Sequence, residues 1–273
     1  MKKLMFGMAA ALALCGMAIE SSNVVGYDTK DVEAGKFYIF APQFETTEGT
    51  SDINKIVSGF TGASYAEFGE DFVKVAPQIQ VPNDKGYDVY FYITDGYYEG
   101  GKEKAGWCDS AGTIAGDVEA LLSGELLSGV AMWVKDVQNA ESFQQAGQVP
   151  TESTVSVDAP VGFALRANPF PIAFNLNDAT FTCEGLPQIS YAEYGEDFVK
   201  YAAQIQVPND KGYDVYYYIT DGYYEGGKEK AGWCDSAGTI AGDAESLLSG
   251  LVPQGQGFWT KGVGSAFKMT FTK

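Results

Sequence analysis

Hydrophobic and polar residues alternate along several short segments of the chain, which is the pattern of half-buried β-strands. Residues 78–81 and 87–94 show this alternation, and the turn-forming residues 82–86 lie between them. Asp95-Gly96 follows, and we expect a tight hairpin turn there because glycine tolerates the positive φ that such turns require. The pattern predicts antiparallel strands joined by short turns.

Further elements are expected on both sides of this region. Residues 36–40 and 132–135 are predicted to supply additional strands, since each is a short and mainly apolar run. One short helix is predicted over residues 117–123, with Asp117 as its N-cap and Gly124 as its terminator. Strands therefore dominate the predicted secondary structure.

The pattern occurs twice in the chain. Residues 64–124 align without a gap to residues 190–250 at an offset of 126, and 55 of the 61 aligned positions are identical. Weaker matches continue on both sides at the same offset. Solenoid repeats are only about 20–50 residues long, so this period predicts tandem globular domains. We predict a signal peptide over residues 1–18 and two β-domains over residues 19–149 and 150–273.

Composition supports a fold rich in strands and turns. The 273 residues include 33 Gly, 17 Tyr and 17 Phe, and glycine and aromatic residues favour turns and strands respectively. We predict an all-β fold with two tandem antiparallel β-sandwich or barrel-like domains, each with one short helix.

The first eighteen residues have the features of an export signal. Lys2 and Lys3 precede an apolar run over residues 4–17, and small residues follow at the expected cleavage site. The run is shorter than the roughly 20 residues of a membrane span. We expect a secreted or cell-surface protein without membrane insertion after cleavage. Lipid anchoring at Cys15 is an alternative, although Leu14 departs from the small residue that lipoprotein signals carry there.

Charge and the absence of histidine exclude several functions. The chain has 36 Asp plus Glu against 18 Lys plus Arg, a net charge of −18, and no His. Catalytic sites in which a histidine activates a serine or cysteine nucleophile are therefore excluded, and so are metal sites with histidine ligands. Nucleic acids and anionic membranes are bound chiefly through clustered basic residues, so neither is an expected partner. We predict a protein that is not an enzyme, and a carboxylate-dependent hydrolase remains a minor alternative.

The aromatic strand is the first candidate binding feature. Alternation places Val89, Phe91 and Ile93 on one face, the expected core, and Tyr90 and Tyr92 on the other. Exposed aromatic rings stack on sugars, whereas the alternative is that cross-strand aromatic pairs only stabilise the sheet. The candidate carbohydrate-binding residues of the two repeats are Tyr90, Tyr92, Trp107, Tyr216, Tyr218 and Trp233.

Acidic residues gather near the loop that contains Gly100-Gly101 in the first repeat and Gly226-Gly227 in the second. Their carboxylates would supply the oxygen ligands that calcium prefers. The spacing of these residues does not match an EF-hand loop. The alternative interpretation is that they form a solvated acidic face. No cofactor other than calcium is expected. The candidate calcium ligands are Asp95, Glu99, Asp109, Asp221, Glu225 and Asp235.

Three cysteines remain after the predicted cleavage. Exported proteins commonly form disulfides, so a Cys183–Cys234 bridge within the second domain is possible, as is a Cys108–Cys234 bridge between domains. The third possibility is that all three are reduced.

Several short motifs carry a family resemblance. They are Asn23-Val24-Val25-Gly26-Tyr27, the run over residues 34–44 and the closing run over residues 255–261. They resemble those of a loosely defined group of secreted, mostly uncharacterised bacterial β-domain proteins. Residues 129–133 depart from the closing pattern of that group. The resemblance implies a secreted β-sandwich-like module of the cell surface or matrix, and it brings no catalytic residues.

These observations lead to two functional hypotheses. The first is an exported, non-enzymatic structural or adhesive protein that self-assembles or binds cell-surface partners, with residues 22–32 and 153–159 as candidate strand-exchange segments. The alternative is a bivalent carbohydrate-binding protein that uses the aromatic strand face of each repeat to bind glycans.

Overall fold

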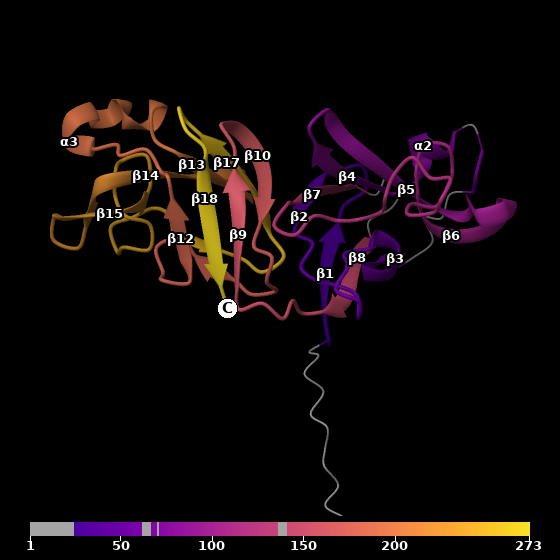
Figure 1. Cartoon of the computed structure of the whole chain (residues 1–273). Helices are drawn as coiled ribbons and strands as arrows, with labels where there is room; N and C mark the ends of the chain where they lie inside the picture. Colours follow the sequence, from indigo (N-terminus) through magenta and orange to yellow (C-terminus); the bar gives the residue numbers. More distant parts are fainter. Residues whose placement is uncertain (1–24, 62–66, 70, 136–140) are drawn as a thin grey trace, which may run out of the picture.

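The computed structural model describes residues 25–61, 67–69, 71–135 and 141–273, which form two lobes side by side (Figure 1). We call the lobe before residue 150 domain 1 and the lobe after it domain 2. The predicted signal peptide, including Cys15, lies outside the described residues.

Domain 1 contains two antiparallel sheets. The larger has five strands in the order β2 (Tyr38–Phe40), β7 (Met132–Lys135), β4 (Gln78–Asn83), β5 (Gly86–Tyr98) and β6 (Lys102–Cys108). The smaller has three strands in the order β1 (Val25–Val32), β8 (Glu141–Gln148) and β3 (Val57–Thr61). The short helices are α1 (Ile53–Ile56), α2 (Phe72–Val75) and the 3-10 turn η1 (Glu99–Gly101).

Domain 2 has the same strand order. Its larger sheet runs β10 (Gly162–Ala167), β17 (Gly257–Gly262), β13 (Gln204–Asn209), β14 (Gly212–Tyr224) and β15 (Lys228–Cys234). Its smaller sheet runs β12 (Phe181–Glu184), β18 (Phe267–Thr272) and β9 (Thr154–Ala159). The remaining elements are β11 (Phe174–Asn175), β16 (Leu251–Val252), α3 (Tyr191–Tyr194) and η2 (Gly195–Lys200). The predicted all-β, antiparallel class is confirmed.

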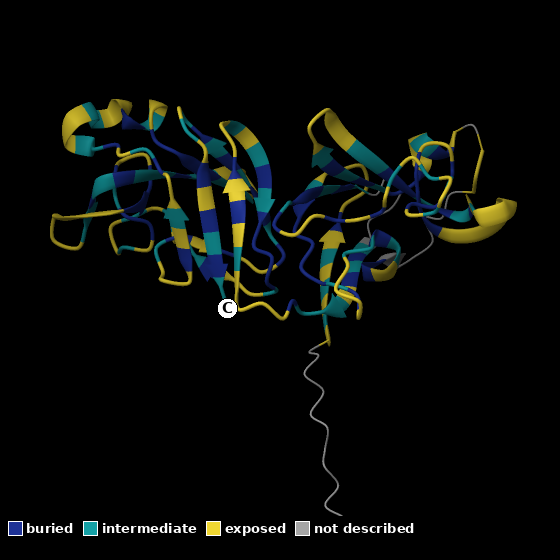
Figure 2. Cartoon of the chain, viewed as in Figure 1, coloured by how far each residue is buried: buried dark blue, intermediate teal, exposed yellow. Residues whose placement is uncertain are grey.

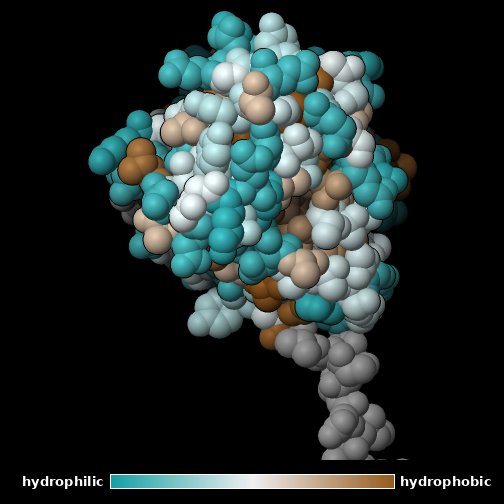
Figure 3. Space-filling model, turned by 90° about the vertical axis from the view of Figure 1, so that its left-hand side faces the viewer, coloured by the Kyte–Doolittle hydropathy of each residue, from teal (hydrophilic) through white to brown (hydrophobic). Residues whose placement is uncertain are grey.

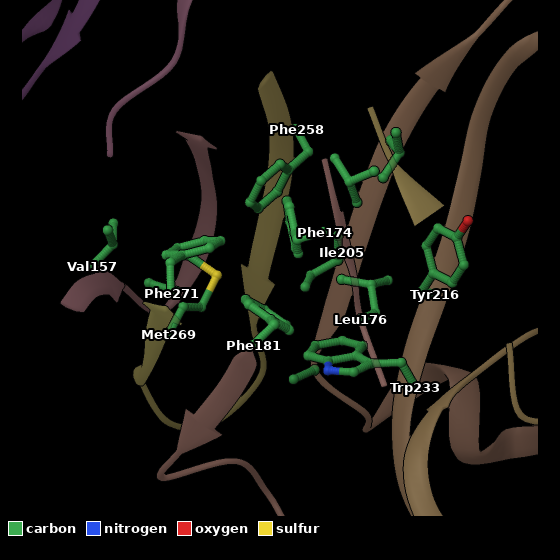
Figure 4. Close-up of a cluster of buried hydrophobic side chains, with 14 of the residues drawn as sticks. Val157, Phe174, Leu176, Phe181, Ile205, Tyr216, Trp233, Phe258, Met269 and Phe271 are labelled. Carbon is green, nitrogen blue, oxygen red and sulfur yellow. The ribbon is translucent and has the colours of Figure 1, made fainter. Parts of the chain in front are cut away.

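Each domain buries its core between its five-stranded and its three-stranded sheet (Figure 2). In domain 2, Phe271 and Met269 of β18 face Ile205, Tyr216 and Phe258 of the larger sheet (Figure 4). Burial of a large apolar side chain stabilises the folded state by about 1.5–3 kcal/mol, so this layer holds the two sheets together. The arrangement is that of a β-sandwich.

The predicted tight turn at Asp95-Gly96 is wrong. The expected strands 78–81 and 87–94 are confirmed within β4 and β5, but β5 continues through Gly96 with a shift in register. A Cβ at Gly96 would lie 2.4 Å from Ile114 Cδ1, so the glycine is needed for close packing. The chain reverses instead at η1, where Gly100 and Gly101 have φ of 75° and 74°.

The predicted helix over residues 117–123 is also wrong, because this segment forms turns. The carboxylate of Asp117 accepts hydrogen bonds from the backbone N–H groups of Glu99 and Glu119, and Leu121 N donates to Asp109 Oδ2. In a helix Leu121 N would donate to the main-chain oxygen of Asp117, so its bond to Asp109 competes with helix formation. The expected strands near residues 36–40 and 132–135 are confirmed as β2 and β7.

One asparagine in each domain ties the chain outside the strands to the edge strand of the larger sheet. Asn54 Nδ2 donates to Trp107 O and Ala115 O, and its Oδ1 accepts from Trp107 N. Asn177 forms the same three bonds with Trp233 and Ala241. The offset of this pair is 123 rather than 126, so the sequence repeat does not align the two residues.

The two domains meet at equivalent positions (Figure 1). Ala41 N donates to Gly255 O at 3.0 Å, and Ala167 N donates to Gly129 O at 2.9 Å. The offset of 126 relates Ala41 to Ala167 and Gly129 to Gly255, so the two hydrogen bonds are reciprocal. The interface therefore has approximate twofold symmetry within one chain.

A small apolar cluster fills the interface. The backbones approach closely at Gly257, where a Cβ would lie 2.5 Å from both Ala131 Cβ and Ile39 Cγ2. Position 257 corresponds to Ala131 in domain 1, so a methyl group is present on one side and absent on the other. The buried members of the cluster are Ile39, Ala41, Ala131, Leu165 and Ala167, with Trp133 and Trp259 packed against them.

Polar side chains fix the domains further. Gln43 Nε2 donates to Asn168 O and Phe170 O across the interface, at 3.2 and 2.6 Å. Lys30 Nζ donates to Gln256 Oε1 at 3.0 Å. These bonds and the apolar cluster set the relative position of the two domains.

We predict that Gly257→Ala loosens the interface. The added methyl group has no room between Ala131 and Ile39, and overpacking of this kind costs about 1–3 kcal/mol. Urea unfolding should show a lower stability, and tryptophan fluorescence should shift to the red as Trp133 and Trp259 become wetter. Gly69→Ala is the control, since a Cβ at Gly69 meets nothing within 4 Å. Equal stability of both variants would contradict the prediction.

Candidate functional site

The predicted aromatic platform does not lie on the surface. Tyr90, Trp107, Tyr216 and Trp233 are 2%, 0%, 1% and 2% exposed, so the expectation of an exposed face is wrong. That face of the strand packs into the core between the two sheets. Tyr92 and Tyr218 are half-buried and lie edge-to-face with Trp107 and Trp233 respectively.

The opposite face of the aromatic strand is also covered. Phe91 and Ile93 pack with Phe72 of α2 and Ile114 in a second small cluster. Domain 2 has the equivalent cluster around Phe198. Alternation predicted one buried and one exposed strand face, but here the tyrosine face enters the core between the sheets and a second small cluster covers the opposite face.

The candidate calcium ligands organise loops. Asp109 is buried and accepts from the backbone N–H groups of Ala111, Thr113 and Leu121. Asp235 accepts equivalent bonds in domain 2. Burial acts to raise the pKa of Asp221, but hydrogen bonds from Ser190, Tyr191 and Ala192 outweigh it and lower that pKa.

The remaining candidates do not join these aspartates in a common site. Asp95 accepts from Phe68 N. Glu99 and Glu225 use their backbone N–H groups to bind Asp117 and Asp243. Across the described residues, no group of three or more acidic or cysteine side chains is placed to hold a metal ion.

The cysteines within the described residues are free thiols, so neither of the possible bridges is present. Cys183 packs into the core between the sheets of domain 2, whereas Cys234 lies in the cluster around Phe198. Cys108 and Cys234 are buried, and each sulfur lies 3.2 Å from a main-chain carbonyl oxygen. Burial raises the pKa of Cys108 to about 12 and raises the pKa values of the other two thiols.

These raised pKa values predict a loss of stability at alkaline pH. A thiol that stays protonated in the folded state stabilises the fold fully below the unfolded-state pKa of about 8.5, and this contribution falls as the pH rises above it. As the pH rises from about 8 to about 9.5, each buried thiol should lower the free energy of unfolding by about 1 kcal/mol. Tyrosine ionises mainly above pH 10, and its smaller contribution in this window is common to the protein with and without the cysteines.

Urea unfolding at the two pH values measures the loss. The comparison is between the unchanged protein and a Cys108→Ala, Cys234→Ala variant, in which the fall with pH should shrink by about 2 kcal/mol. An equal fall in both proteins would contradict the assignment to these thiols.

Two clefts at the domain junction form the candidate site. Cleft A lies between the β4–β5 turn of domain 1 and strands β10 and β17 of domain 2, with a volume of about 690 Å³. Cleft B lies between the β13–β14 turn of domain 2 and strands β2 and β7 of domain 1, with a volume of about 560 Å³. The 126-residue offset relates the two, so each domain supplies a turn to one cleft and a sheet edge to the other.

Accessible aromatic side chains line both clefts. Tyr87 and Phe163 in cleft A are 44% and 55% exposed, and Trp259 is half-buried between the two domains. Their counterparts in cleft B are Tyr213, Phe37 and Trp133.

A continuous row of rings connects the clefts. Phe37, Trp133, Trp259 and Phe163 follow one another edge to face, with centroid separations of 6.0, 6.2 and 6.3 Å. Lys135 and Lys261 lie over the two phenylalanine rings, with their Nζ atoms 4.8 and 5.2 Å from the centroids. We call these four residues the aromatic row.

Polar groups stand opposite the aromatic row. In the β4–β5 turn, Asn83 Nδ2 donates to Asp88 Oδ1 at 2.7 Å, and Asn83 Oδ1 accepts from Lys85 N at 2.8 Å. The β13–β14 turn repeats both bonds with Asn209. These bonds hold each turn in one conformation and leave further carboxylate oxygens facing solvent.

The clefts were not predicted from the sequence. The only available signal was the weak match at offset 126 that pairs Phe37 with Phe163 and Trp133 with Trp259. The partner turns come from the other domain, so the site depends on a domain interface that local patterns do not encode.

The end of domain 2 that faces away from domain 1 is mainly hydrophilic (Figure 3). No helix among the described residues is long and apolar enough to cross a membrane.

Comparison of the chain with known protein families, with curated proteins and with solved structures found no match.

Proposed function

We propose that the chain is an exported, non-enzymatic adhesive protein that binds carbohydrate in clefts A and B. The observation that carries this proposal is the pair of equivalent clefts, each with accessible aromatic rings opposite a rigid polar turn. Export rests on the predicted signal peptide. The proposal keeps the carbohydrate hypothesis but moves the site from the buried strand face to the domain junction.

The chemistry of the clefts fits a sugar. The C–H face of a pyranose ring packs on an aromatic ring, while its hydroxyl groups exchange hydrogen bonds with amide and carboxylate oxygens. Ligand sites combine apolar walls with a few polar groups in this way, and the volumes of both clefts fall within the roughly 300–1,000 Å³ of such sites.

Two linked sites strengthen binding to a repeated ligand. Each cleft alone is open and shallow enough to expect weak affinity. When both bind the same polymer or surface, the second event is intramolecular, and the avidity exceeds either affinity by a factor of about 10²–10⁴. The fixed interface between the domains holds the two clefts at a constant separation.

Glycan-array binding tests the proposal. We expect the mature protein to bind one or more glycan classes, and Phe37→Ala with Phe163→Ala to weaken binding at least about fivefold, because each of the two lost aromatic contacts is worth roughly 0.5–1.5 kcal/mol. Tyr201→Ala is the control, since Tyr201 is 47% exposed and lies outside both clefts. A blank array for the parent protein, or equal binding by the double variant, would contradict the proposal.

Self-assembly through a strand edge is a second candidate function. β1 is an edge strand of its sheet, and its Val25 and Tyr27 are 73% and 78% exposed. Its counterpart β9 carries hydroxyl groups instead, with Ser156 Oγ 3.0 Å from the hydroxyl of Thr270. Apolar side chains on an open edge favour pairing with another strand.

Sedimentation velocity over a range of concentrations tests this assembly. We expect association that increases with concentration and is reduced by Tyr27→Asp, which places a charge on the edge. Ser156→Asp on β9 is the matched control and should leave association unchanged. A protein that stays monomeric at every concentration would rule out assembly.

A further inference from the structure

The two clefts differ in charge although their aromatic residues correspond. Cleft A is lined by three acidic side chains, Asp84, Asp88 and Glu125, and by one basic side chain, Arg166. Cleft B is lined by two acidic and two basic side chains, Glu33 and Asp210 with Lys30 and Lys36. The charges of the lining side chains therefore sum to −2 in cleft A and to zero in cleft B. Lys261 over Phe163 and Lys135 over Phe37 add one positive charge beside each cleft, so the difference of two charges remains.

The basic groups of cleft B are already engaged. Lys36 forms an ion pair with Glu33, and Lys30 donates to Gln256 Oε1 at 3.0 Å. Burial lowers the pKa of Lys30, in keeping with its position under the interface. The lining side chains of cleft B thus present no excess charge of either sign.

The acidic groups of cleft A are not balanced in this way. Asp84 and Glu125 are exposed and Asp88 is half-buried, and no ion pair joins any of them to a basic side chain in the described part of the chain. Arg166 is the single arginine of the sequence. Its Nε and Nη1 atoms donate to the main-chain oxygens of Asp158 and Leu165, at 2.6 and 2.7 Å.

Arg166 therefore braces the cleft wall rather than neutralising the opposite turn. Its bonds connect β9 to β10, the strand that carries Phe163. The corresponding position in domain 1 is Phe40, which is buried, so this brace belongs to cleft A and has no equivalent in cleft B. The carboxylates on the turn face an aromatic wall across the cleft.

We propose that cleft A binds a sugar residue that carries a protonated amine. This inference rests on the proposed carbohydrate function and assigns its ligand class in one of the two clefts. The sugar ring packs on Phe163 and Trp259, and the ammonium group lies toward Asp84 and Glu125. The net charge of −18 also favours approach of a cationic polymer over an anionic one.

A matched pair of ligands isolates the amine. β-1,4-linked glucosamine oligomers and their N-acetylated counterparts have the same backbone and differ only in the charged group. At about pH 5.5 and low salt, where the amine is protonated, we expect the glucosamine oligomer to bind about tenfold more tightly by isothermal titration calorimetry. Added salt of about 0.5 M should remove most of this preference by screening.

Matched variants assign the preference to cleft A. Asp84→Asn with Glu125→Gln removes two charges from cleft A, and Glu33→Gln with Asp210→Asn removes two from cleft B. All four side chains are exposed, so both variants should fold normally, which thermal unfolding checks. We expect the preference for the amine to disappear in the first variant and to persist in the second.

The outcomes separate this inference from the proposed function. Equal affinity of the unchanged protein for the two oligomers, or a preference that survives Asp84→Asn with Glu125→Gln, overturns the amine site and leaves carbohydrate binding intact. Failure to bind either oligomer also overturns the amine site, and the glycan array then decides separately whether the protein binds other sugars.

Discussion

The close approach of the two domains at Gly257 is the constraint on which the candidate site depends. Two reciprocal main-chain hydrogen bonds join the domains, and the cluster around Ala131 excludes water between them. Both clefts take one wall from each domain. If the domains separated, each cleft would lose either its turn or its aromatic wall, although each β-sandwich would keep its own core.

The interface also explains why a duplicated chain has two unequal sites. The repeated segments supply nearly identical turns, which contain Asn83 in domain 1 and Asn209 in domain 2. The sheet edges come from the less similar flanks, where Arg166 corresponds to Phe40 and Ala164 corresponds to Tyr38. Each cleft therefore combines a turn that is nearly the same in both domains with a sheet edge that differs between them. Differences in ligand preference are expected to arise from the sheet edge and from nearby loop residues such as Glu125.

Much of the fold could be predicted from the sequence, because its signals are local. Alternation identified β4 and β5, and turn residues marked the hairpin between them. The helix at residues 117–123 and the turn at Asp95-Gly96 were wrong, since hydrogen bonds to Asp109 and packing against Ile114 override local preference there.

The candidate site was far less predictable. Alternation along β5 gave one face to the core, but both faces are covered, and the tyrosines chosen for exposure lie inside. The accessible rings come from strands at the domain junction. Their side chains have ordinary spacing, and nothing in the local pattern shows which loop of the other domain lies opposite them.

The difference between Ala131 and Gly257 has a consequence for the fidelity of assembly. In a pair formed by two copies of domain 1, Ala131 would stand where Gly257 stands, and its methyl group would collide with Ala131 and Ile39 of the other copy. A pair of second domains would instead leave a void between two glycines. The methyl group of Ala131 therefore fits opposite Gly257 of the second domain but not opposite a second copy of itself, which favours pairing of the two unlike domains.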